Sequence, residues 1–362
     1  MIRLPLCPPA PFQPISPGAA PHRPRGPERS RLGWMRFLGT ALVALAAAAG
    51  QQADRAVLEA ARPGVLWRAP ADLGMENWTC GSAGCDHTPA PPFHFVKEDM
   101  RGTFPKLTIR DAKGRDWNVK FGGKVIPESF CSRFVAAIGY VVEPSYYVAS
   151  GRLNDISRLH RARNFVTADG AFRRARFQLR DDKTLEFLKN RAWSLADNPF
   201  RGTHQFAGLR VVMMLLSNWD AKDSRQGQEG ANTGIFRGPD GEVLYSFFDW
   251  GSALGRWGKV MRRTRSDCAG FDADSPNLIT GVHDNVVTWG YSGKHEDDIK
   301  DGITIEDLRW LAPYLGRITD EQIRAGLAAS GATPRQASCW AEGLEYRIHA
   351  ILAVARAGRY WR

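Results

Sequence analysis

Hydrophobic and polar residues alternate in two neighbouring stretches of the chain, Lys106–Arg110 and Asp116–Phe121. A period of two is typical of strands that bury one face. The residues between them, Asp111–Gly114, have the composition of a turn, so the pattern predicts an antiparallel hairpin. The short aromatic-rich stretch Phe93–Lys97 predicts an earlier strand, and Glu98–Pro105 predicts a loop that is long enough to fold over a site.

The apolar spacing changes to that of a helix after the strand-breaking pair Gly122-Gly123. Pro127 and Glu128 mark the predicted start of this helix and Gly139 its end, since proline favours the first helical turn and glycine the position after the last. A further strand is expected at residues 140–142 or 146–148. Residues 93–150 therefore predict a small unit of strands and one helix.

The remainder of the chain is mostly helical in pattern. Residues 182–193 and 202–216 predict two helices, and the apolar stripe of the second is typical of a core helix. Residues 218–277 predict largely irregular structure. Three more helices are expected at 304–315, 319–330 and 338–357. The fold class is thus α+β, with a small β-rich lobe at 93–150 and a larger, mostly helical lobe at 151–362.

The N-terminal region has the layout of an export signal. Residues 1–34 are rich in Pro and Arg, which predicts a disordered leader or, if Met35 is the true start, an over-extension of the chain. Residues 35–52 combine a basic start, an apolar run and small residues, as a secretory signal peptide does. The alternative is a membrane anchor at residues 36–50, although this run is shorter than the ~20 residues that span a bilayer. We expect an exported protein, periplasmic or extracellular, with membrane contact only through such an anchor.

Cysteines occupy the region that follows the signal. Residues 53–92 predict an irregular extension that contains Cys80 and Cys85, and in an oxidising compartment this Gly-rich pair predicts a disulfide. The alternative is a zinc site completed by His87 and His94. Cys131 has apolar neighbours and is expected in the core.

The formal net charge of +11 comes from arginines that are scattered along the 362 residues. A basic balance suits nucleic acid, acidic lipid or phosphate-bearing ligands. However, no Lys/Arg run is interleaved with aromatic residues and no zinc-finger spacing occurs, so no nucleic-acid partner is expected.

Charged residues with the types and order needed for phosphoryl transfer are present. Lys120 ends an amphipathic strand and Glu128 opens the next helix, while Asp220 follows a buried helix and Asp249 follows a hydrophobic strand. Transfer from ATP requires a lysine on the phosphates, a glutamate that holds the lysine, an aspartate at the accepting hydroxyl and an aspartate on the metal. Lys222, two residues after Asp220, is placed to neutralise the transferred phosphoryl group.

These motifs resemble those of the kinase group that includes the HipA-like toxin kinases, the CotH-type spore-coat kinases and the secretory-pathway Fam kinases. The residues that carry the resemblance are Val119-Lys120-Phe121, Asn218-Trp219-Asp220-Ala221-Lys222-Asp223 and Phe248-Asp249-Trp250-Gly251. The resemblance implies a two-lobed protein-kinase-like fold over residues 93–350, ATP with Mg²⁺ or Mn²⁺ as cofactors, and membership of an exported bacterial branch.

The sequence also departs from the pattern of this group in two places. A metal-binding asparagine commonly lies five residues after the catalytic aspartate, but this position is Arg225. Asn232 takes the role if residues 226–230 are an insertion. The loop expected over the phosphates contains only Gly102 in place of a Gly-x-Gly-x-x-Gly pattern.

Three functions follow as hypotheses. The first is an ATP-dependent kinase whose phosphoacceptor is a protein or a small molecule. The second is a pseudokinase, a binding module without transfer activity, which Arg225 and the scarcity of ATP outside the cytoplasm favour. The third is a metal-dependent phosphoesterase, which would combine carboxylates with histidines around metal ions. Its candidate ligands are Asp220, Asp223 and Asp249, with His283 or His295.

Overall fold

The computed structural model describes residues 64–74, 77–100, 104–180, 185–188, 191, 193–220, 232–257, 263–294 and 296–357. The predicted leader and signal segment lie outside the described residues. So do five residues that the sequence singled out: Gly102, Lys222, Asp223, Arg225 and His295.

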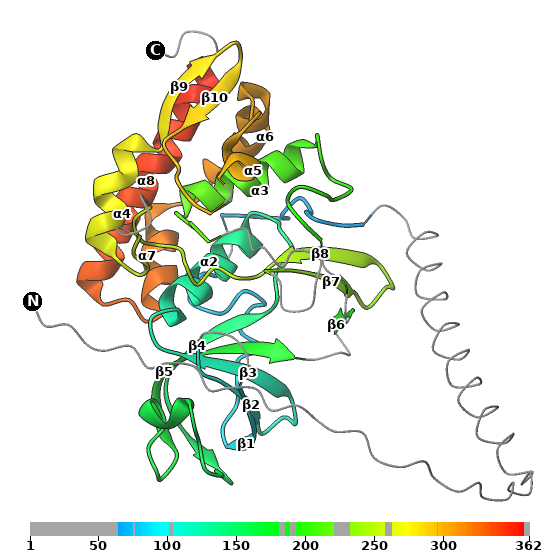
Figure 1. Cartoon of the computed structure of the whole chain (residues 1–362), viewed down its shortest axis with the longest axis vertical. Coiled ribbons are helices and arrows are strands. Elements are labelled where there is room, and N and C mark those ends of the chain that lie inside the picture. The colour runs from blue at the N-terminus through cyan, green and yellow to red at the C-terminus, as the bar shows by residue number, and fades with distance from the viewer. Residues whose placement is uncertain are drawn as a thin grey trace, which may run out of the picture. The chain divides into compact units, whose positions relative to one another are not determined.

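The described chain has an α+β architecture whose first strands, from residue 93 on, form a closed barrel of five strands (Figure 1). The barrel strands are β1 (Phe93–Asp99), β2 (Lys106–Arg110), β3 (Asp116–Phe121), β4 (Ser145–Asn154) and β5 (Ala171–Arg180). Their order is β1-β2-β3-β5-β4, and a parallel pairing of β1 with β4 closes the barrel. The predicted hairpin is confirmed with both strand boundaries as expected, and the later strand is the second of the two alternatives.

Side chains of alternate residues fill the barrel. In β3, Trp117, Val119 and Phe121 are buried and lie in one core cluster with Ile109 of β2 and Phe177 of β5. The residues between them, including Lys120, therefore lie on the opposite face of the strand. The barrel extends to residue 180, beyond the lobe boundary expected at 150.

Helix α2 (Val125–Ala137) follows β3 after a short turn and packs against β4 and β5. It begins two residues before the predicted Pro127. Gly139, just past its end, has a φ of 98°, a conformation that glycine adopts without steric cost.

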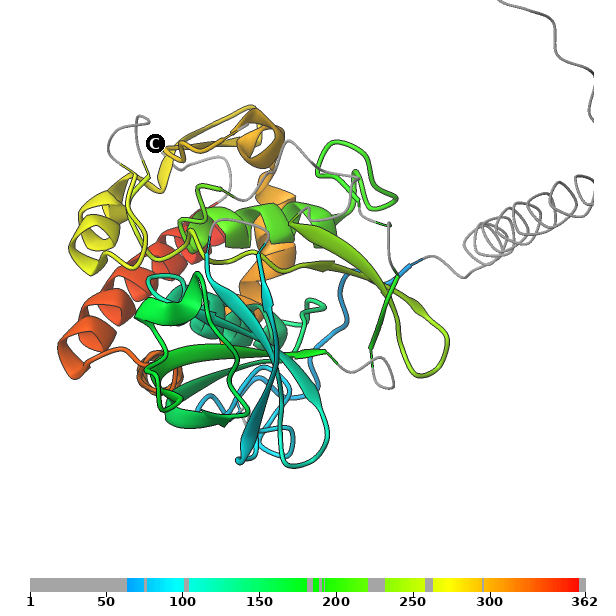
Figure 2. The ribbon, with the colours of Figure 1, turned by 60° about the horizontal axis from the view of Figure 1, so that its bottom comes forward.

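The C-terminal region contains helices and two small sheets. Figure 2 shows the barrel strands in the lower part of the view, the helices α3 and α4 above them and α8, in red, to their left. The helices are α3 (His204–Leu215), α4 (Cys268–Asp274), α5 (Asp297–Lys300), α6 (Ile305–Leu315), α7 (Asp320–Ala328) and α8 (Pro334–Ala357). Four of these, α3 and α6 to α8, confirm predicted helices.

Two predictions are wrong at the positions of these small sheets and of α4. One sheet contains β6 (Glu186–Phe187), β7 (Thr233–Arg237) and β8 (Val243–Phe247), and the other contains β9 (Ile279–His283) and β10 (Val286–Trp289). The predicted helix at 182–193 is wrong, because the residues described there include β6, which pairs with β7. The expectation of irregular structure over 218–277 is also wrong where β7 and α4 occur.

Two disulfides join described cysteines. Cys80 is bonded to Cys85 as predicted, so the alternative of a zinc site at these cysteines is wrong. His94, a proposed ligand of that site, has its Nδ1 at 2.6 Å from Asp155 Oδ2. Cys268 is bonded to Cys339, which connects α4 with α8. Cys131 is buried, as expected. The two disulfides suggest an oxidising, extracytoplasmic setting.

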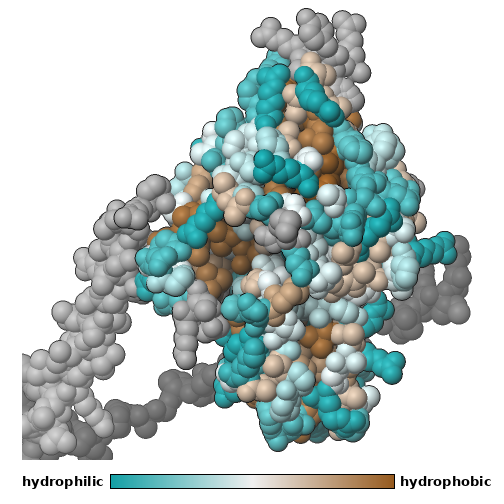
Figure 3. Space-filling view, turned by 180° about the vertical axis from the view of Figure 1, so that it is seen from behind, coloured by the Kyte–Doolittle hydropathy of each residue, from teal (hydrophilic) through white to brown (hydrophobic). Residues whose placement is uncertain are grey.

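The surface of the described residues is mixed in polarity. Figure 3 shows hydrophobic residues in separate areas bordered by hydrophilic ones. Exposed side chains of large hydrophobic residues include Met100 and Tyr346, which are 56% and 52% exposed. Among the described residues, no helix is both long and apolar enough to span a bilayer.

Candidate functional site

A buried ion pair joins the barrel to the helix that follows it. Lys120 Nζ, on the outer face of β3, lies 2.7 Å from Glu128 Oε1 in the first turn of α2. The side chains are 18% and 2% exposed, so the pair is largely shielded from water. Because the turn between β3 and α2 is short, these two candidate residues are brought together by local chain geometry.

The second carboxylate oxygen of Glu128 is paired with Arg176 of β5. Arg176 is the direct cross-strand neighbour of Lys120, and its side chain is also buried. Its guanidinium donates in addition to Gln178, two residues further along β5. Sequence analysis missed Arg176, although its alternation with buried Phe177 would have placed it on the same face as Lys120.

The charges of this cluster determine its protonation. Burial lowers the pKa of Lys120, while Glu128 opposes that shift. Burial acts to raise the pKa of Glu128, but the charges of Arg176 and Lys120 outweigh it and leave this pKa below its ordinary value. The Glu128 carboxylate is therefore ionised at neutral pH and holds two cations.

Asp249 lies next to this cluster, in the turn that follows β8. Both of its carboxylate oxygens accept hydrogen bonds from Lys124 Nζ, at 3.1 and 3.3 Å, and Oδ1 also accepts from the backbone N–H of Gly251. A Cβ at Gly251 would lie 2.8 Å from Glu128 Oε1 and 2.3 Å from Lys124 Cδ. Only glycine therefore lets this turn approach the Glu128 carboxylate so closely.

The lysines around Asp249 hold it in the charged form. Burial acts to raise the pKa of Asp249, but the charges of Lys120 and Lys124 outweigh it and place this pKa well below its ordinary value. The side chain remains 27% exposed and is thus accessible to a ligand.

Helix α3 ends in a tight motif that directs Asp220 away from the core. The N–H groups of Ser217 and Asn218 donate to the carbonyls of Met214 and Met213, which is the bonding pattern of a Schellman motif. Ser217 has a φ of 53°, where glycine is usual. Buried Arg347 donates to its hydroxyl at 2.6 Å and stabilises this strained residue.

Two asparagines connect the segments that carry the two aspartates. Asn218 Nδ2 donates to the backbone carbonyl of Asp249, and Asn232 Nδ2 donates to that of Asp220, both at 3.0 Å. Asn232 precedes β7, and the pairing of β7 with β8 places it beside Phe248. The structure therefore gathers Lys120, Glu128, Asp249, Asp220 and Asn232 into one region.

Asp220 has a partner that the sequence did not indicate. Lys294 Nζ lies 3.0 Å from Asp220 Oδ1, and the Lys294 backbone N–H donates to the carbonyl of Trp219. The two side chains are 54% and 31% exposed, so this ion pair stabilises the fold little. It does place a cation at the candidate base.

Aromatic rings contact cationic side chains beside the two candidate aspartates. The Phe104 ring, in the connection between β1 and β2, lies 5.1 Å from Lys124 Nζ and 5.4 Å from the Arg265 guanidinium. Arg265 also lies 5.4 Å from the Trp219 ring. The predicted loop at 98–105 is shorter than expected, since β1 includes Glu98 and Asp99.

Among the described residues, no group of three or more His, Cys, Asp or Glu side chains could hold a metal ion. The phosphoesterase hypothesis gains no support from this part of the chain. No protein-family model matches the sequence, and no curated protein or solved structure matches it either.

Proposed function

We propose that this chain is an ATP-dependent phosphotransferase with a kinase-like fold, with Asp220 as catalytic base and Asp249 as metal ligand. The observation that carries the proposal is the buried pair of Lys120 and Glu128 with Asp249 beside it. In kinases, a lysine of the third strand is paired with a glutamate of the next helix, and a later aspartate holds the metal. A β-rich barrel followed by a helical region provides the two parts that a kinase-like fold requires.

The residues at Asp249 suit a hard divalent cation such as Mg²⁺ or Mn²⁺. Asp249 supplies an ionised carboxylate, and Asn232 supplies an amide oxygen while its nitrogen is bonded to Asp220. Magnesium is commonly held by one or two carboxylates together with substrate phosphates, so a larger cluster is not required. When bound, the metal neutralises charge on the phosphates.

The remaining residues supply binding and proton transfer. In this proposal Lys120 binds the α- and β-phosphates, and Glu128 and Arg176 fix its position. Asp220 accepts the proton of the acceptor hydroxyl as that oxygen bonds to the γ-phosphorus and the bond to the ADP oxygen breaks. Lys294 provides positive charge at the transferred group, the role expected of Lys222. The acceptor is a hydroxyl of a protein or a small molecule.

One observation favours a second candidate, the pseudokinase. Lys124 bonds both carboxylate oxygens of Asp249, so an ammonium group already neutralises the metal ligand. A binding module that has replaced its metal with a lysine would have this arrangement.

A single experiment separates the two candidates. The purified chain is incubated with Mg²⁺ and γ-labelled ATP, and label transfer and hydrolysis are measured for the wild type, Asp249→Ala and Asp220→Ala. Asp240→Ala is the matched control, because Asp240 is exposed in the turn of the same β7–β8 hairpin. The kinase proposal expects activity in the wild type and the control, and its loss in both site variants. Activity that survives both site variants, or its absence from the wild type, would overturn the proposal.

A further inference from the structure

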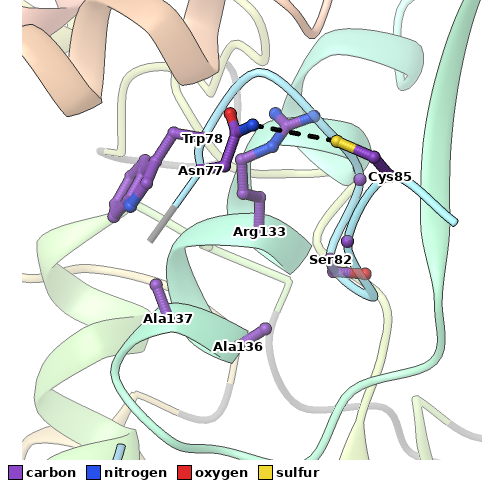
Figure 4. Close-up of a pocket in the computed structure, with 9 residues that line it drawn as sticks. Asn77, Trp78, Ser82, Cys85, Arg133, Ala136 and Ala137 are labelled. Carbon is purple, nitrogen blue, oxygen red and sulfur yellow. Dashed lines mark hydrogen bonds between the residues drawn. The ribbon is translucent and has the colours of Figure 1, made fainter. Parts of the chain in front are cut away.

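A pocket lies beside the Cys80–Cys85 disulfide (Figure 4), and none of its lining residues belongs to the proposed phosphotransfer site. Its volume is about 120 Å³. This is several times the ~10–15 Å³ that one water molecule requires. The pocket is lined by residues of the segment 77–85, which contains the disulfide, and by Arg133, Ala136 and Ala137 of α2.

Arg133 is the only residue with a full charge that lines this pocket, and its side chain is buried. Its Nε donates to the carbonyl of Cys80, and its Nη1 donates to the carbonyl of Gly326 at 2.8 Å and to Ser330 Oγ at 2.6 Å. All three acceptors are uncharged. Within the described ranges, no carboxylate lies at ion-pair distance from this guanidinium, and Nη2 donates to no protein atom.

A buried cation without a counterion is costly, and proteins normally pair such groups. The other buried arginines, Arg176 and Arg347, show two ways of meeting this cost. Arg176 has the Glu128 carboxylate, and Arg347 donates four hydrogen bonds that use Nε, Nη1 and Nη2. Arg133 has neither a carboxylate nor a partner for Nη2, and a pocket adjoins it.

We propose that this pocket binds a small oxyanion, a carboxylate or phosphate group, through Arg133. The planar guanidinium matches both groups in shape and charge. Burial lowers the pKa of Arg133 to about 10, so the side chain keeps its charge at neutral pH. Trp78, Ala136 and Ala137 provide an apolar wall, which suits the carbon skeleton of a short carboxylate, whereas Ser82 and Asn77 line the polar part.

The test measures anion binding to the full chain by titration calorimetry, with phosphate, sulfate and acetate as probes at constant ionic strength. Ala136→Leu fills the pocket from α2 while it keeps the Arg133 bonds, and Arg133→Gln removes the charge. Arg158→Met is the surface control, since Arg158 is exposed. Lys120→Met removes phosphate binding at the other site.

We expect saturable binding of at least one probe below about 10 mM in the wild type, Arg158→Met and Lys120→Met. Ala136→Leu should weaken it at least tenfold, about 1.4 kcal/mol. If Arg133→Gln does not fold, the comparison of anion binding by Ala136→Leu with that by the wild type decides the test. No saturable binding, equal binding in Ala136→Leu, or loss of binding in a Lys120→Met protein that is shown to be folded would each overturn the proposal. This test does not depend on the proposed phosphotransfer, because it measures anion binding and not enzymatic activity.

Discussion

Replacing Glu128 with glutamine tests whether one carboxylate holds two buried cations. The side chain is 2% exposed and is paired with Lys120 at 2.7 Å and with Arg176. Glutamine keeps the shape but removes the charge, so both cations lose the carboxylate to which they are directly paired. Breaking a buried ion pair in this way typically costs about 3–5 kcal/mol of unfolding free energy. The expected loss for Glu128→Gln is therefore at least this large.

The assay is urea unfolding at pH 7, followed by tryptophan fluorescence. Glu306→Gln is the matched control, since Glu306 pairs with Arg309 at 3.3 Å but is 49% exposed. Its loss should stay within about 0.5 kcal/mol. Adding Arg176→Met to Glu128→Gln removes one stranded cation and should restore part of the lost stability. Unfolding of Glu128→Gln within about 1 kcal/mol of the wild type, at an unchanged slope with urea, would refute the reasoning.

The same variant has a predicted pH signature. The pKa of Glu128 in the folded protein lies below its ordinary value of 4.5. Just below pH 4.5 the unfolded chain thus binds more protons than the folded one, so this contribution is complete above that pH and declines as the pH falls. Unfolding free energy measured against pH should decline less steeply in Glu128→Gln over this window.

Two further predictions concern the metal ligand and the disulfides. Lys124→Met removes the ammonium group bonded to Asp249 and should raise Mg²⁺ affinity in a fluorescence or calorimetric titration, whereas unchanged or weaker binding would contradict the assignment of Asp249 as metal ligand. Replacing both cysteines of the Cys268–Cys339 disulfide with serine should cost about 4 kcal/mol, against about 2 kcal/mol for the Cys80–Cys85 disulfide. The difference arises because the sequence separations are 71 and 5 residues, and denaturant unfolding with equal losses would contradict it.

The strands whose two boundaries could be predicted from the sequence are those with an uninterrupted period of two. In β2 and β3 every second residue is buried, and their boundaries are as expected. Strand β5 was missed because two exposed residues, Arg173 and Arg174, interrupt its pattern. Arg174 has a φ of 57°, and it is missing from the paired positions of β4 and β5, whose register is the same on either side of it. A local irregularity of this kind prevents a strand from being recognised by the period of its hydrophobic residues.

Long-range pairing explains the wrong helix at 182–193. Glu186 and Phe187 form a strand only because they pair with Arg237 and Phe236 of β7, about fifty residues later. Helical periodicity in a short stretch cannot report a partner so distant in sequence. The Cys268–Cys339 disulfide escaped prediction for the same reason, since its two cysteines lie on different helices.

In the candidate site, too, local contacts could be predicted from the sequence and long-range contacts could not. Lys120 and Glu128 are eight residues apart and joined by a short turn, so their types and spacing indicated a pair that the structure brings together. Lys294 reaches Asp220 only because its own backbone N–H is bonded to the carbonyl of Trp219. That contact depends on how the segment before α5 lies against the end of α3, which no local pattern encodes. The groups that bear the proposed chemistry could thus be found from the sequence, whereas three of the cations paired with them, Lys124, Arg176 and Lys294, became evident only in the tertiary structure.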